Sequence, residues 1–149
     1  MHITNIPLIL SSLSFACPYF VAVSTGNMYS AFAWGCLTCT STLVHSTKQP
    51  FHLYGPGNCI GWLYALDVGA LYLCVVRSLI DGWAGGPTAF AMALTTIGYA
   101  GVMFYGGQRL GKFVYDTYLD MSILSHFTVH LLSSFGGVGV LCLRALKNG

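Results

Sequence analysis

Two histidines near the C-terminus have a spacing that suits metal binding. His126 and His130 are four positions apart, so on a helix both imidazoles lie on one face, one turn apart. This arrangement can present two nitrogens to one metal ion. The same spacing occurs where histidines only form hydrogen bonds within a packed bundle, so the pair alone leaves both interpretations open.

Three more polar residues lie within long apolar runs: Ser41, His45 and Asp67. A charged side chain in the hydrocarbon core of a membrane costs about 2.5–3.5 kcal/mol on insertion scales, so such residues are candidates for function. Three histidines with an open fourth position and a nearby carboxylate form the ligand set of a catalytic zinc site. His45 therefore strengthens the metal interpretation of the C-terminal pair.

Ser41 and Asp67 each have a chemical and a structural interpretation. Ser41 precedes His45 by one helical turn; beside a metal its hydroxyl could assist a substrate carbonyl, and otherwise it is an ordinary packing residue. Asp67 could orient water, accept its proton or support a ligand histidine. Alternatively it could line a water pocket or pair with Arg77, but nearly three turns separate these two residues on one helix.

The composition requires a lipid environment. Hydrophobic residues make up 55% of the 149 residues and charged residues only 7%, whereas a soluble domain carries about 25% charged residues. The net charge of +2 comes with no basic run, so we expect no nucleic-acid partner. The six cysteines lie in or beside apolar runs, and we expect them, including the Cys36-x-x-Cys39 pair, to act as small packing residues.

Runs of about 17–25 apolar residues predict the membrane-crossing helices. We expect an all-α polytopic bundle in which residues 1–149 form a single transmembrane domain. The five predicted spans are Ile6–Ser24, Met28–Ser46, Cys59–Ile80, Gly86–Tyr105 and Met121–Leu143. The first run has the length of a secretory signal, but no basic residue precedes it, so we interpret it as a retained helix.

The alternating direction of the spans predicts where the polar residues meet. The second span ends on the side where the third and the fifth begin, so His45 and Asp67 share one half of the membrane with the histidine pair. Small residues within the spans predict close helix packing; they include Gly69, Ala70, Gly98, Gly101, Gly136, Gly137 and Gly139. Lys and Arg divide evenly between the two sides and leave the orientation open.

Together, these motifs resemble those of a known group of membrane proteins. The pattern is Ser-x-x-x-His at Ser41 and His45, Asp at Asp67 on the next span, and His-x-x-x-His at His126 and His130. It resembles the CREST superfamily of membrane hydrolases, which includes alkaline ceramidases, adiponectin-type receptors, GPI-anchor lipid-remodelling proteins and myomaker-like proteins.

The resemblance implies a zinc ion held by His45, His126 and His130, with Asp67 acting on the bound water and Ser41 assisting at the substrate carbonyl. It also implies membrane lipids, cleaved at an amide or ester, as substrates. Members of the superfamily typically have seven spans, whereas five are predicted here. The two missing helices fall between the Asp67 helix and the last helix, which preserves the alternation of direction.

Other functions also fit the residues. One is a receptor-like or scaffolding membrane protein that retains the metal site without turnover. A haem-binding bundle would use the intramembrane histidines as axial ligands, and a small transporter or channel subunit would use them with Asp67 to relay protons. A homo-oligomer that completes the cavity is also compatible with the sequence.

Overall fold

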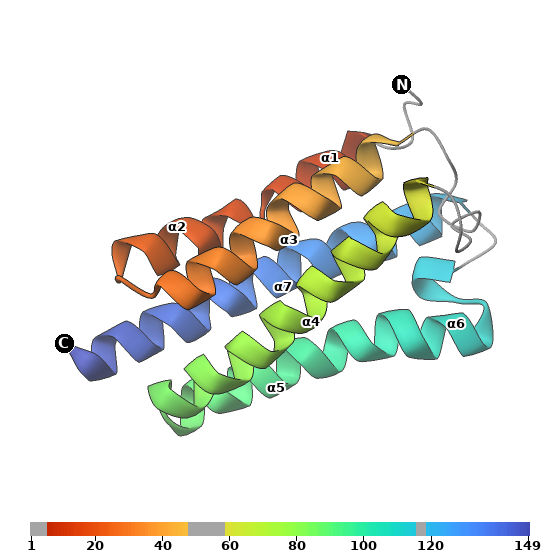
Figure 1. The fold of residues 1–149 in the computed structure, drawn as a ribbon. Coiled ribbons are helices and arrows are strands. Elements are labelled where there is room, and N and C mark those ends of the chain that lie inside the picture. Colours follow the sequence, from red (N-terminus) through yellow and green to blue (C-terminus); the bar gives the residue numbers. More distant parts are fainter. Residues whose placement is uncertain (1–5, 48–58, 116–118) are drawn as a thin grey trace.

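The computed structural model describes residues 6–47, 59–115 and 119–149, and all regular elements in these ranges are helical. The long helices of these ranges lie side by side and alternate in direction, so the first helix begins and the last helix ends at opposite ends of the bundle (Figure 1). The elements are α1 (Ile6–Leu13), α2 (Ala16–Ser24), α3 (Met28–Ser46), α4 (Cys59–Gly85), α5 (Pro87–Gly101), the π-helical η3 (Val102–Gly106), α6 (Gly107–Leu110), the 3-10 helix η4 (Phe113–Tyr115) and α7 (Leu119–Asn148).

Four helical stretches are long and apolar enough to cross a membrane. They cover Ile6–Ser24, Gly61–Gly85, Pro87–Leu110 and Met121–Asn148. The remaining stretch, α3, has 19 residues but includes several polar side chains within its length, among them Ser30, Thr40, Ser41 and His45. The predicted all-helical bundle is therefore confirmed in the described residues, and four of its helices have the length and apolarity to span a membrane, while α3 is not among them.

Several helix boundaries differ from those predicted. The third span continues past Ile80 to Gly85, and the last begins at Leu119 and ends at Asn148. The first span is interrupted at Ser14 and Phe15, which separate α1 from α2. The fourth span starts at Pro87, where proline at the first helical position lacks the amide hydrogen that would have no partner there.

Helix α7 lies between two groups of helices. It packs against α1 and α2 of one group and against α4 and α5 of the other (Figure 1). Close packing at this helix depends on glycine. A Cβ at Gly137 would come within 2.5 Å of the Trp34 ring, and one at Gly136 would collide with Thr96. By contrast, a Cβ at Gly69 or Gly98 would meet nothing within 4 Å.

The predicted role of the small residues in packing is therefore confirmed at the glycines of α7. Gly139 belongs with them, because a Cβ there would collide with Met92. Gly101, like Gly69 and Gly98, has open space where a Cβ would be. The prediction is wrong at these three positions, since no neighbouring helix approaches them closely.

A buried ion cluster ties together the bundle end that holds the C-terminus. Asp81 is 1% exposed and accepts hydrogen bonds from Arg77 (2.7 Å), Arg144, Ser30 and Asn27 (3.2 Å). These residues belong to α4, α7, the start of α3 and its N-cap. The predicted third span ended at Ile80, whereas α4 continues to Gly85 and includes Asp81. Its charge is tolerated because two guanidinium groups surround it.

Candidate metal centre

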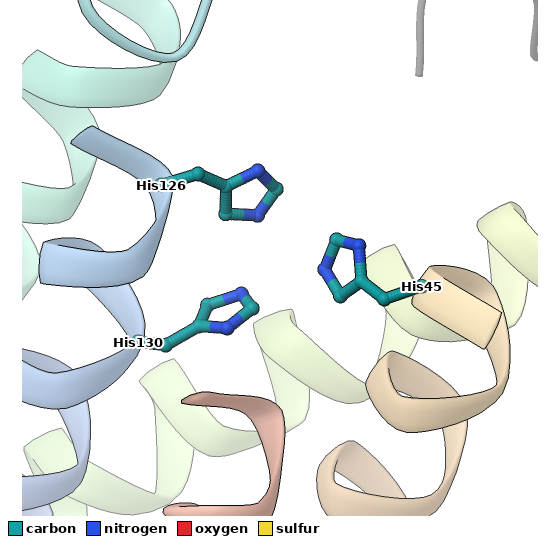
Figure 2. Close-up of side chains that lie close together, drawn as sticks. All are labelled: His45, His126 and His130. Atoms are coloured by element: carbon teal, nitrogen blue, oxygen red, sulfur yellow. The ribbon is translucent and has the colours of Figure 1, made fainter. Parts of the chain in front are cut away.

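Three histidines from two helices meet near the other end of the bundle. His45 lies in the last turn of α3, and His126 and His130 lie in the early turns of α7. One side-chain nitrogen from each lies within 4.8 Å of the other two. Figure 2 shows the rings pointing toward a common space between the two helices. Each residue is 5% exposed, so the group is enclosed by protein.

The end of α3 positions His45. The helix stops at Ser46, and Thr47 caps it by donating its backbone N–H (3.1 Å) and its hydroxyl (2.7 Å) to the Val44 carbonyl. Capping satisfies a carbonyl that the helix itself leaves without a partner. His45 is thereby held in a regular turn, and its ring faces those of His126 and His130 at centroid distances of 4.8 and 5.2 Å.

Aromatic side chains form two walls of the group. Phe104 meets His126 edge-on, with ring centroids 5.3 Å apart, and Phe15 meets His130 at 5.0 Å. Phe104 lies in the π-helical turn η3, and Phe15 lies at the interruption between α1 and α2. π-helical turns frequently occur at functional sites. Both irregular backbone segments therefore place an aromatic ring against a histidine.

Serine hydroxyls from α1 contact the Nδ1 atom of His130. The Oγ atoms of Ser11 and Ser12 lie 2.9 and 3.4 Å from Nδ1 of His130. Ser12 also lies 3.0 Å from the hydroxyl of Ser41, which connects Ser41 to the histidine group through Ser12. All three serines are 2% exposed or less. The predicted site residue Ser41 is therefore near the histidines, but as part of a chain of hydroxyls.

Asp67 lies beside the group and outside it. Its Oδ1 accepts a hydrogen bond of 2.9 Å from the Thr40 hydroxyl, which joins α4 to α3. Among the described residues, the group that could share one ion contains the three histidines and not Asp67. The alternative pairing with Arg77 is not observed, because Arg77 bonds Asp81 instead. Asp67 thus keeps Oδ2 for other chemistry.

An apolar pocket lies deeper in the bundle than the histidines. It has a volume of about 40 Å³ and lies between α3, α4, α5 and α7. Its lining includes Leu71 and Ser133, about one turn beyond Asp67 and His130 respectively, and continues to Trp34 and Val140. The pocket therefore starts near the histidines and extends toward the middle of the bundle.

Comparison with known proteins gave no relative: no protein-family model, curated protein or solved structure matches the chain. The interpretation of the site therefore depends on its own geometry. That geometry supports a bound metal ion, because three imidazole nitrogens converge in a buried space. It does not identify the metal.

The sequence analysis missed Ser11, Ser12, Thr40 and Phe104. The available signal was the cluster of Ser11, Ser12 and Ser14 in an otherwise apolar run. Hydroxyls are common in membrane helices, where they can bond to the backbone of their own helix. The cluster alone could not show that His130 was their partner. Cys36 and Cys39 are free cysteines; Cys36 is half-buried and Cys39 is exposed on the surface of the bundle.

Proposed function

We propose that this chain is a zinc-dependent integral-membrane hydrolase that cleaves a lipid amide or ester, and that it is a five-span member of the CREST superfamily in which α3 also crosses the membrane. The observation that carries the proposal is the buried group of three histidines from two helices. Three protein ligands and one open position are typical of catalytic zinc, whereas structural zinc sites usually have four protein ligands.

The residues around the histidines support a division of roles. Bound zinc supplies Lewis acidity and activates water for attack on the carbonyl. Hydrolysis adds hydroxide to the acyl carbon and returns one proton to the leaving amine or alcohol. Asp67 would carry that proton on Oδ2, because Thr40 occupies Oδ1. Ser41 would act at the carbonyl, on the side of the site formed by α3.

The pocket supports a lipid substrate. Its lining is mostly apolar, and it starts about one turn from the histidines. Its volume of about 40 Å³ accommodates a few CH₂ groups of a substrate whose carbonyl lies at the histidines, and burial of each CH₂ contributes about 0.8 kcal/mol. Phe104 and Phe15 would limit water access from two sides. Such a site favours a substrate drawn from the bilayer.

A receptor-like or scaffolding protein is the second candidate. The placement of Asp67 outside the histidine group favours it, since the carboxylate is bonded to Thr40 rather than to a ligand. A haem protein fits less well. Axial histidines lie on opposite faces of a flat macrocycle, whereas the rings of His126 and His130 are 4.6 Å apart.

Elemental analysis of the detergent-purified protein tests the proposal. We expect about one zinc per chain, as in a mononuclear site, and loss of zinc in His45→Ala, His126→Ala and His130→Ala. Ser46→Ala is the matched control, because Ser46 is exposed and bonds only its own helix at Thr42. Zinc with turnover of lipid amides or esters supports the hydrolase. Zinc without turnover favours the scaffold, and a native protein free of metal refutes both.

A further inference from the structure

Two serine hydroxyls of α1 contact Nδ1 of His130, so they bear on which ring nitrogen carries the hydrogen. A serine hydroxyl has one proton and can accept at its oxygen. The hydroxyls of Ser11 and Ser12 lie 3.0 and 2.7 Å from the Leu8 carbonyl oxygen. This oxygen also accepts the Ser12 backbone N–H within α1, so its second lone pair serves one hydroxyl. When Ser11 donates to Leu8, its oxygen is left as an acceptor toward His130.

A metal ligand must present a lone pair, so Nδ1 of His130 carries the hydrogen when Nε2 binds the metal. Nδ1 then donates to Ser11 at 2.9 Å, and Ser12 lies 3.4 Å away. A neutral imidazole has only one N–H, so the lone pair of His130 is then on Nε2. Ser12 and Ser41 share a hydrogen bond of 3.0 Å. When Ser11 occupies the Leu8 carbonyl, Ser12 donates in this bond, and the Ser41 proton is left for a substrate carbonyl.

We propose that Ser11 is a positioning residue of the metal centre: it accepts the Nδ1–H of His130 and thereby keeps Nε2 available as the metal ligand. The inference rests on the proposed metal site and adds a residue from the first span, which the superfamily motif does not include. A histidine ligand usually donates its other N–H to an acceptor that fixes its orientation. Here that acceptor is a hydroxyl that is 1% exposed.

The backbone supports this placement of Ser11. The chain turns out of α1 immediately after Leu13, and Ser14 bonds Ser134 of α7 at 2.7 Å. Ser134 in turn donates to the His130 carbonyl at 2.9 Å. Phe15 packs against the His130 ring. The end of α1 is therefore attached to α7 at the same turn that carries the ligand, which holds Ser11 and the imidazole together.

Histidine ¹⁵N spectra of the labelled full chain test the tautomer directly. With and without zinc, we expect the protonated nitrogen of His130 to be Nδ1; His130→Gln assigns the signal. Protonation at Nε2, or zinc bound through Nδ1, would overturn the inference. Because the metal-free protein also gives a result, the inference can fail or stand separately from zinc binding.

Zinc affinity provides the second measurement, by competition with a chelator. Ser11→Ala should weaken binding about 10–100-fold, the usual effect of losing a ligand's supporting partner. Ser24→Ala is the matched control, since its exposed hydroxyl bonds the Val21 carbonyl of its own helix, and it should leave the affinity unchanged. Equal affinities for Ser11→Ala and the native protein would refute the positioning role, whereas a native protein without zinc would refute the proposed function.

Discussion

Neutralising Asp81 should destabilise the bundle strongly without changing its metal content. The carboxylate is 1% exposed and has two arginine partners, whose side chains are 16% and 28% exposed. Asp81→Asn keeps the shape of the side chain and removes its charge, so Arg77 and Arg144 lose their counter-ion. Breaking a buried ion pair from one side costs about 3–5 kcal/mol.

The exposure of the arginines places the expected loss at the lower end of that range. Their long stems allow the charged groups to reach the membrane surface once Asp81 is neutral. We therefore expect a loss of about 3 kcal/mol in the free energy of unfolding. Arg77→Met should cost less, about 1.5 kcal/mol for one hydrogen bond to a charged group, because Arg144 still neutralises Asp81.

Unfolding in mixed micelles with an increasing fraction of SDS, followed by tryptophan fluorescence, measures both variants. Zinc per chain is determined in the same samples and should equal that of the native protein, because Asp81 contacts Ser30 at the start of α3, whereas His45 lies in its last turn. A loss below about 0.5 kcal/mol for Asp81→Asn, the size of an ordinary surface substitution, would refute the reasoning. So would a larger loss for Arg77→Met than for Asp81→Asn.

Three further predictions concern packing and the site. Gly137→Leu should lower the free energy of unfolding by about 1–3 kcal/mol, because the added side chain overlaps Trp34. Gly98→Leu should change it little, because the space there is open. Similar losses in the two variants would contradict this reasoning. Asp67→Asn should retain zinc and lose turnover of a lipid amide or ester, and full activity would remove Asp67 from the mechanism. Zinc at 100 times its dissociation constant should stabilise the native protein by about 2.7 kcal/mol, which a rise in melting temperature measures, and should leave His45→Ala unaffected. An equal rise in the native protein and in His45→Ala would place the metal elsewhere.

The grouping of the histidines was predictable because it depends on topology. Successive spans must reverse direction, so a histidine at the end of the second span and a pair early in the fifth lie in the same half of the bundle. The structure brings His45, His126 and His130 together as this argument requires. Which nitrogen each ring presents could not be predicted, because it depends on hydrogen bonds with residues such as Ser11, 119 positions away.

The ends of the helices were less predictable than their existence. A charged residue after an apolar run usually marks the end of the membrane, and this rule ended the third span at Ile80. The helix continues because Asp81 finds Arg144 on another helix, 63 positions later in the chain. The interruption of the first span had a signal in Pro18, which cannot donate to the Ser14 carbonyl four residues earlier and clashes with it. Cys17 N–H bonds this carbonyl instead.

Both polar clusters have consequences for biosynthesis, because α7 completes them. His130 follows Ser11 by 119 positions, and at about 5–20 residues per second this separation corresponds to roughly 6–24 s of translation. Until α7 is made, the serines of α1 lack His130, and Asp81, which precedes Arg144 by 63 positions, has Arg77 of its own helix as its charged partner. The early helices therefore carry two incomplete polar clusters that only the last helix completes.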